Sequence, residues 1–382
     1  MRSWKRLIAM ALAGVLTVGC AAGCAGASEQ PENGSAAASS DTKQPIITVM
    51  TSSMGGEKHH MMQAGTILQG QELGYTINIL APNNAANTQE VINDLAAAQT
   101  YSDAIVFMPN YDTMTPEEEN TQAYLNQIIP ALSDVRAEGI PVVLMSYDLD
   151  DDRAYDAFCG VNRYRAGRAL GAQIAENQPN AVVGLIQLDS VTKSYKIWEK
   201  GIVDALQENG CTVLEDSAVA DWDFNTATSL CTALMENHPN LTTFVCMSDW
   251  LAGAASKAVQ KAGRQEIPKE EMTESEWSTN VSEETEANDS GETQTEVEPV
   301  QVYAVSWTVG GMKSILDGSL KAEVFENPMQ VGRDSITLAD QLLKGQTVKK
   351  INRTPYVLVT QENAQALKDT ISEGLAQVGL TS

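Results

Sequence analysis

Short apolar strands alternate with amphipathic helical stretches along almost the whole chain from residue 46 onward. The helical stretches include TQEVINDLAAAQ, YRAGRALGAQIAEN and VGRDSITLADQLLKG. The strands are nearly continuous in apolar residues, which is typical of a parallel sheet with helices on both faces. The pattern therefore predicts an α/β fold. The predicted strands are residues 46–52, 76–82, 104–109, 141–148, 156–162, 182–189, 212–221, 242–249, 300–307, 321–328 and 355–360.

The length and charge of the chain limit its organisation and its partners. With 382 residues, the chain is longer than one ordinary hydrophobic core requires and suits two domains. Its formal net charge is -25 and its pI is about 4.4. Because so acidic a surface repels phosphate backbones, we expect no nucleic-acid partner.

The N-terminal residues have the features of an export signal. MRSWKR is basic, LIAMALAGVLTVG is too short to span a bilayer comfortably, and small residues surround Cys20 and Cys24. A signal that ends at Gly-Cys resembles a bacterial lipobox, whose cysteine is lipidated. We favour Cys20, which directly follows the apolar run, with Cys24 as the alternative; an ordinary secreted protein with two stray cysteines is the competing interpretation. We thus expect a lipoprotein signal peptide (1–20), a flexible tether (21–44) and an exported protein lipid-anchored to the outer face of the bacterial cell membrane.

Residues 265–299 interrupt the alternation of strands and helices. The segment QEIPKEEMTESEWSTNVSEETEANDSGETQTEVEP is dominated by acidic and small polar residues. Such a composition cannot bury enough apolar surface to become ordered. We therefore predict a disordered acidic insertion, and binding of calcium or of a partner is the alternative.

Polar and aromatic side chains follow most of the predicted strands, at the point where each strand ends. Examples are MSYD (145–148), MSDW (247–250) and VSW (305–307). The carboxyl ends of parallel strands meet at one edge of a sheet, where ligands bind. Hydroxyls, carboxylates and amides pair with hydroxyl groups, and aromatic faces pack against apolar ring faces. The pattern therefore predicts a polar cleft for a small solute that resembles a sugar or a polyol.

Three longer stretches resemble the type I periplasmic binding proteins, in particular the ribose-binding and related sugar-binding group. They are AGRALGAQIAEN, ADWDFNTATSLCTALMENHPNLTTFVCMSDWLAGAASKAVQKAGR and MKSILDGSLKAEVFENPMQVGR, followed by PYVLVTQENA near the C-terminus. The motifs are loose one by one, but their order and spacing are specific as a set. The resemblance implies two similar, doubly wound parallel-sheet lobes joined by a three-crossing hinge, with the ligand between them.

The resemblance also implies where the lobes begin and end. We expect an N-lobe of residues 45–161 and 328–354, and a C-lobe of residues 162–327 and 355–380 that contains the acidic insertion. A ligand that contacts both lobes better in the closed state would drive closure about the hinge.

Carried over position by position, the family's ligand contacts fall on a changed set of residues. The family's aromatic pair after the first strand falls on Lys58 and His59, and its aspartate after the fourth strand falls on Ser146, followed by Tyr147 where an arginine often stands. Several charged contacts are thus replaced, and a pocket without that network is not expected to hold ribose. We expect a modified or larger sugar. The other expected ligand contacts are Trp198, Trp222, Ser248, Asp249, Ser306, Trp307 and Glu326.

No motif in the sequence indicates catalysis, a metal or a cofactor, and we expect none of them. His59-His60 lacks the glutamate of an HExxH motif, and DLDDD (148–152) lacks the glycine and final glutamate of a calcium loop, so we interpret it as a solvated turn. Gly55-Gly56 follows the first strand without a third glycine or a helix-start pattern. We find no GxSxG motif, Walker loop or dinucleotide fingerprint.

The leading hypothesis is a lipid-anchored extracytoplasmic substrate-binding protein. It would capture a small polar, sugar-like solute as a monomer and deliver it to the permease of an ABC importer. The alternative is a ligand-sensing lipoprotein that signals to a membrane sensor kinase or chemoreceptor. An exported hydrolase is a more remote alternative.

Overall fold

The computed structural model describes residues 44–84, 86–110, 118–188, 193–215, 218–220, 223–265 and 298–381. The predicted signal peptide with Cys20 and Cys24, nearly all of the tether, Trp222 and nearly all of the acidic insertion lie outside the described residues.

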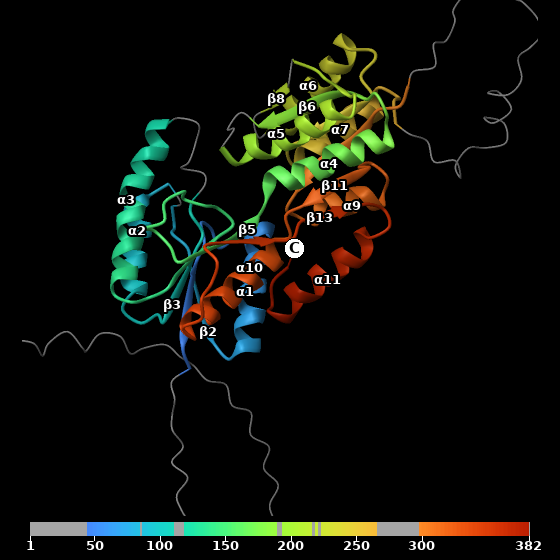
Figure 1. The fold of residues 1–382 in the computed structure, drawn as a ribbon. Coiled ribbons are helices and arrows are strands. Elements are labelled where there is room, and N and C mark those ends of the chain that lie inside the picture. Colours follow the sequence, from blue (N-terminus) through green and yellow to red (C-terminus); the bar gives the residue numbers. More distant parts are fainter. Residues whose placement is uncertain are drawn as a thin grey trace, which may run out of the picture. The chain divides into compact units, whose positions relative to one another are not determined.

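The first lobe is built on a parallel sheet with the strand order β12-β5-β4-β3-β1-β2. Helices α1 (Glu57–Leu73) and α10 (Pro328–Leu343) cover one face of this sheet, and α2 (Thr88–Ala98) and α3 (Glu118–Ala137) cover the other (Figure 1). This two-sided cover explains why β3, β4 and β5 are buried along their whole length. The strands are β1 (Ile46–Met50), β2 (Thr76–Leu80), β3 (Ala104–Phe107), β4 (Val142–Met145), β5 (Ala157–Val161) and β12 (Ile351–Thr354).

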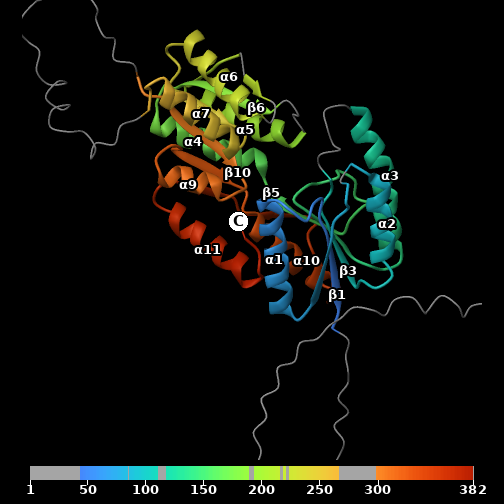
Figure 2. The same ribbon diagram turned by 180° about the vertical axis from the view of Figure 1, so that it is seen from behind.

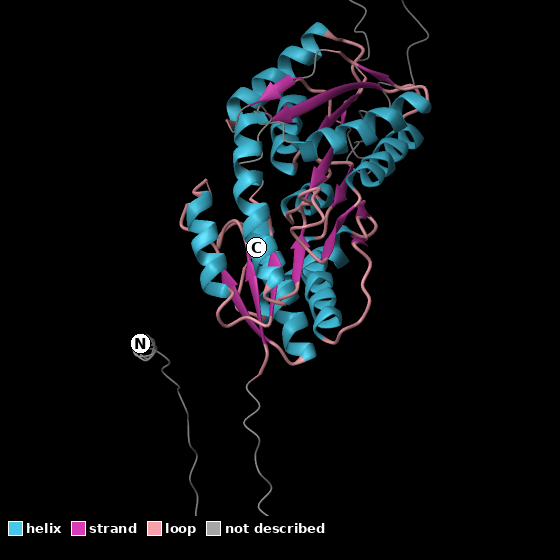
Figure 3. Cartoon of the chain, turned by 60° about the vertical axis from the view of Figure 1, so that its left-hand side comes forward, coloured by secondary structure: helices cyan, strands magenta, loops and turns pink. Residues whose placement is uncertain are grey.

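The second lobe is built on a sheet with the order β13-β11-β10-β9-β6-β7, in which β8 also pairs with β6. Its pairs are parallel except for β13, which runs antiparallel to β11. Helices lie on both sides of each sheet (Figures 2 and 3). The strands are β6 (Val182–Leu188), β7 (Thr212–Val213), β8 (Ala218–Ala220), β9 (Thr243–Cys246), β10 (Gln301–Ser306), β11 (Ala322–Phe325) and β13 (Val357–Val359). The helices are α4 (Arg163–Asn177), α5 (Lys193–Glu208), α6 (Phe224–Asn237), α7 (Asp249–Lys261), α9 (Gly310–Leu316) and α11 (Ala364–Gln377).

The chain passes between the two sheets three times. It leaves the first sheet after β5, returns to it between β11 and β12, and leaves it again between β12 and β13. The predicted fold class, two α/β lobes with parallel sheets, is confirmed. The residue boundaries proposed above for the two lobes stay a prediction.

Three local features differ from the sequence prediction. The strand predicted at 212–221 is two short strands, β7 and β8. Strand β12 was not predicted at all. Helix α1 starts directly after Gly56, which takes a φ of 88°. The sequence shows no helix-start pattern here because glycine offers no side chain to cap the helix.

Close backbone packing fixes helix α1 on the first lobe. A Cβ atom added at Gly65 of α1 would lie 2.0 Å from the carbonyl oxygen of Met329, and one added at Gly332 of α10 would lie 2.4 Å from that of Met62. The two helices therefore touch through their backbones, which only glycine permits. This contact holds in place the first turn of α1, which carries two of the residues predicted to contact the ligand, Lys58 and His59.

Candidate functional site

A buried charge cluster joins residues of both lobes around Glu326, which directly follows β11. Oε1 of Glu326 accepts a hydrogen bond from Nη2 of Arg163 at 2.6 Å and one from Oγ of Ser146 at 3.3 Å. Oε2 of Glu326 lies 3.3 Å from Nζ of Lys58. Glu326 is 2% exposed and Ser146 is fully buried. The carboxylate thus has two cations and a hydroxyl as partners.

The pKa shifts of Glu326 and Lys58 keep both side chains charged at neutral pH. Burial acts to raise the pKa of Glu326, but Arg163 and Lys58 outweigh it, and the pKa is lowered. Burial acts to lower the pKa of Lys58, but Glu326 and Tyr147 outweigh it, and the pKa is raised. Each charge therefore depends on its neighbours, because a buried charge without partners would neutralise instead.

Two aromatic rings surround the ammonium group of Lys58. Its Nζ lies 5.0 Å from the ring centroid of Tyr147 and 5.3 Å from that of Trp307, and it donates a hydrogen bond of 2.9 Å to the Tyr147 hydroxyl. The guanidinium carbon of Arg163 lies 4.7 Å from the Tyr147 ring. The Trp307 ring meets Tyr195 edge to face, with centroids 5.9 Å apart. Cation–π attraction and ring packing thus add to the ion pairs.

The backbone at three element ends places these side chains. Ser146 follows β4 with a φ of 70°, a conformation that non-glycine residues rarely adopt. Asn162 caps α4 by accepting from the backbone N–H of Arg165, which puts Arg163 in the first helical turn. Asn327 has a φ of 52° and caps α10, and this turn ends β11 just after Glu326. Left-handed residues at two of these positions indicate local strain that the surrounding contacts stabilise.

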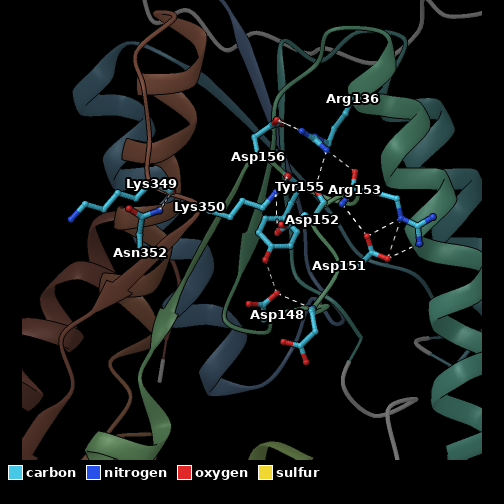
Figure 4. A network of polar contacts seen from close by, with 11 residues as sticks. Arg136, Asp148, Asp151, Asp152, Arg153, Tyr155, Asp156, Lys349, Lys350 and Asn352 are labelled. Carbon is cyan, nitrogen blue, oxygen red and sulfur yellow. Dashed lines mark hydrogen bonds and ion pairs between the residues drawn. The ribbon is translucent and has the colours of Figure 1, made fainter.

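A second polar network anchors the segment that carries Ser146 and Tyr147 (Figure 4). The Arg136 guanidinium binds the Asp156 carboxylate at 2.6 Å and donates to the carbonyl oxygen of Arg153 at 2.7 Å. Nζ of Lys350 donates to the carbonyl oxygen of Tyr155 at 2.5 Å, and the Tyr155 hydroxyl donates to Asp148. The connection between β4 and β5 is therefore tied to α3 and to the residues before β12.

The carboxylates of DLDDD (148–152) take part in this network. Asp151 accepts from Arg153, and Asp148 accepts from the backbone N–H of Asp150 as well as from Tyr155. Within the described ranges, no group of three or more His, Cys, Asp and Glu residues has a geometry that could hold a metal ion.

The segment Ser306–Gly311, which follows β10 and carries Trp307, is held by side chains of its own lobe. The Thr308 hydroxyl donates to the Asp249 carboxylate, and Oγ of Ser306 donates to the carbonyl oxygen of Thr308 at 3.2 Å. Ser248 caps α7 by accepting from the backbone N–H of Leu251 at 3.1 Å, which presents Asp249 in the first helical turn. Burial raises the pKa of Asp249.

Glu323 lies behind this segment, in the middle of β11. Its side chain is fully buried, and neither carboxyl oxygen has a hydrogen-bond partner among the residues that the structure describes. Burial raises the pKa of Glu323 well above its ordinary value, and the nearby Asp249 raises it further. A Cβ atom at Gly311 would collide with the Glu323 carboxyl group, so the two residues pack tightly together.

A family model described as a periplasmic binding protein domain matches residues 47–347. The chain belongs to this family. The resemblance predicted from the sequence is therefore confirmed. None of the helices in the described part of this periplasmic binding protein has the length and hydropathy that crossing a bilayer requires.

The chain is similar to several individual proteins of known name or structure. The ribose import binding protein RbsB of Salmonella typhimurium is 22% identical over 310 residues, which cover 79% of this chain and 86% of that protein. A solute binding protein of Actinobacillus succinogenes, solved with bound D-allose, is 16% identical with a TM-score of 0.65 and 85% and 100% of the two chains covered. A solute binding protein of Bacillus halodurans, solved with bound myo-inositol, is 18% identical with a TM-score of 0.62 and 86% and 99% covered.

The residues predicted to contact the ligand fall into separate groups in this periplasmic binding protein. The structure brings Lys58, Ser146, Tyr147, Trp307 and Glu326 together. Ser248, Asp249 and Ser306 cap α7 or hold the segment around Trp307. Nε2 of His59 lies 2.9 Å from Oγ of Ser52, and burial together with Lys58 lowers its pKa to about 4.

Trp198 lies outside these groups of predicted ligand contacts. It is 2% exposed and belongs to the hydrophobic core with Leu170 and Ile202 of the packed pair α4 and α5. A Cβ atom at Gly167 would lie 2.4 Å from the Trp198 carbonyl oxygen, which shows how closely the two helices approach. Its ring is accounted for by core packing, and we leave it out of the proposed site.

Arg163 belongs to the Glu326 cluster but is not among the ligand contacts predicted from the sequence. A cation in the first turn of a helix is opposed by the helix dipole. An arginine directly after the capping Asn162 therefore signals a nearby carboxylate, which the structure identifies as Glu326.

Proposed function

We propose that this periplasmic binding protein captures a small polar, sugar-like solute in a cleft between its lobes and delivers it to an ABC importer. The observation that supports this most directly is the convergence of Lys58, Tyr147, Trp307 and Glu326 from both lobes at the carboxyl ends of β4, β10 and β11. Aromatic faces together with charged hydrogen-bonding groups suit the two kinds of surface on a sugar or polyol. Relatives with ribose in their name or with D-allose or myo-inositol bound support the same class of ligand.

The position of the Lys58 ammonium group argues against ribose as the ligand. The Lys58 ammonium lies between Tyr147 and Trp307, so a sugar ring cannot stack on both faces without displacing it. A ligand that instead hydrogen-bonds the ammonium and packs beside Trp307 fits the arrangement. We therefore propose a modified or larger sugar as the ligand.

A thermal-shift screen tests the proposed function. We expect at least one sugar or polyol from a set that includes allose, inositol, glucose and galactose to raise the melting temperature, because a ligand that binds only the folded state stabilises it. With that ligand, Trp307→Ala should weaken binding by about 1–3 kcal/mol in calorimetry. If no sugar or polyol shifts the melting temperature, the proposal is wrong.

A core tryptophan provides the matched control for this measurement. Trp198→Phe keeps an aromatic ring in the core and should leave the affinity unchanged, because Trp198 packs between helices. Equal losses for the Trp198 and Trp307 variants would show that the affinity change reports general destabilisation rather than a ligand contact.

We also propose that Cys20 carries the lipid anchor. The support is the sequence around it, an apolar run that ends at Gly19-Cys20 after a basic start. Cys20→Ser should move the protein from the membrane fraction to the soluble fraction of the bacterium, whereas Cys24→Ser should leave it in the membrane fraction. The reverse result would assign the anchor to Cys24, and membrane retention of both variants would contradict lipidation at either cysteine.

A further inference from the structure

A hydrogen bond from the first turn of α1 reaches the second lobe. Oε1 of Glu57 accepts from the backbone N–H of Val309 at 2.6 Å. Glu57 begins α1, which packs on α10 and the first sheet and also contacts α11, whereas Val309 lies between β10 and α9 of the second lobe. The bond therefore joins the two lobes, and neither of its partners is among the residues proposed to contact the ligand.

The amide of Val309 is held ready for this bond. The Val309 side chain is 1% exposed and packs in a hydrophobic core that consists mainly of second-lobe residues and also includes Met61 and Ala64 of α1. The preceding Thr308 donates its hydroxyl proton to Asp249 and accepts from the backbone N–H of Gly310 at 3.1 Å. Because the backbone is fixed on both sides of Val309, its N–H cannot reorient towards another acceptor without breaking these neighbouring contacts.

The neighbouring residue of α1 contacts the same segment. Nζ of Lys58 lies 5.3 Å from the ring centroid of Trp307, two positions before Val309, and 3.3 Å from Glu326. Glu57 and Lys58 are adjacent in one helical turn that α10 fixes to the first lobe. Both contacts therefore require the same lobe position and would be lost together on lobe separation.

We propose that Glu57 is a latch that holds the two lobes together by its bond to Val309, without touching the ligand. A hydrogen bond to a charged carboxylate is worth more than one between neutral groups. Such a bond, present only when the lobes meet, raises the population of the closed state in the absence of ligand. A second consequence rests on the proposed function. The latch should tighten the binding of any ligand that prefers the closed state, because a larger fraction of the protein is then competent to bind.

Hydrogen exchange of the protein without added ligand tests the latch. In Glu57→Ala, amide exchange in the segment Ser306–Gly311 should become about tenfold faster or more, and the radius of gyration from small-angle X-ray scattering should increase. Exchange in β9 should not change, since β9 lies inside the second sheet. Glu57→Gln keeps an oxygen acceptor without its charge and should give a smaller effect than the alanine variant.

Glu72→Ala is the matched control for the latch. Glu72 also lies in α1, but it pairs with Arg333 of α10 at 2.8 Å, within the first lobe. This variant should change neither the exchange of Ser306–Gly311 nor the radius of gyration. Unchanged values in Glu57→Ala, or equal changes in Glu57→Ala and Glu72→Ala, would overturn the proposal. Because no ligand is added, that failure is distinct from a negative result in the sugar screen.

Discussion

Replacing Arg163 by methionine should lower the free energy of unfolding by about 3–5 kcal/mol, as for other buried ion pairs that lose one partner. The variant leaves the Glu326 carboxylate, 2% exposed, with its shortest contact removed. Lys58 at 3.3 Å and Ser146 at 3.3 Å stay as partners, but the first is a longer ion pair and the second is neutral. Urea unfolding at pH 7 measures the loss.

An exposed ion pair of the same helix provides the control. Arg168 of α4 binds Glu208 of α5 at 2.5 Å, but the Arg168 side chain is 35% exposed to solvent and that of Glu208 is 59% exposed. Arg168→Met should therefore cost much less than Arg163→Met, because solvent screens exposed ion pairs. Equal losses for the two arginine variants would show that the Glu326 cluster does not depend on its charges.

The central strands could be predicted from the sequence because burial on both faces selects continuous apolar runs. Strands such as β3 and β9 are buried at every position, and the predicted ranges contain them. Strand β12 was not predicted because it lies at the edge of the first sheet and has the sequence INRT, which is exposed at two of its four positions and has a single apolar residue. An edge strand needs only its backbone for pairing, so its side chains give no apolar signal.

Most of the candidate site could be predicted because its residues directly follow strands. Tyr147, Trp307 and Glu326 were found in this way, because the fold brings strand ends together. The direction of a side chain, by contrast, depends on packing that the sequence does not show. Asp249 turns to Thr308 and Trp198 turns into the core, although both occupy positions that matched ligand contacts of the family.

Glu323 could not be singled out from the sequence, since a lone glutamate inside a strand is normally a residue of the solvated face. The structure instead places it against Gly311, close to Asp249. It thus lies behind the segment that carries Trp307 and the latch amide of Val309. A buried carboxyl group without a hydrogen-bond partner lowers the free energy of unfolding. Its protonation state should therefore affect how firmly the segment Ser306–Gly311 is held.

Glu323→Gln should therefore make the protein more stable at pH 7, because the amide keeps the size of the carboxyl group and cannot ionise. Each unit by which the folded state raises the pKa of Glu323 costs the wild type about 1.4 kcal/mol once the pH has passed the raised pKa. The folded state raises the pKa of Glu323, through burial first and then through Asp249 and Glu57. These effects outweigh the nearby Ser306 hydroxyl, which acts to lower the pKa, so the folded state favours the protonated carboxyl group. The stabilising contribution of that proton is complete below the ordinary glutamate pKa of about 4.3 and is lost as the pH rises through the raised pKa of the folded state. Glutamine has no proton to lose, so the advantage of the variant should be small at pH 4 and should grow towards pH 7.

Urea unfolding of both proteins between pH 4 and pH 8 measures this difference, and Glu362→Gln, at an exposed position of the second lobe, serves as the control. The control should follow the wild type at every pH, because an exposed carboxylate is hydrated in both the folded and the unfolded state. A constant difference between Glu323→Gln and the wild type would show that the effect comes from packing against Gly311 rather than from ionisation. A variant that is less stable than the wild type at pH 7 would contradict the buried, unpaired carboxyl group itself, since it would mean that the charged form has partners that stabilise it.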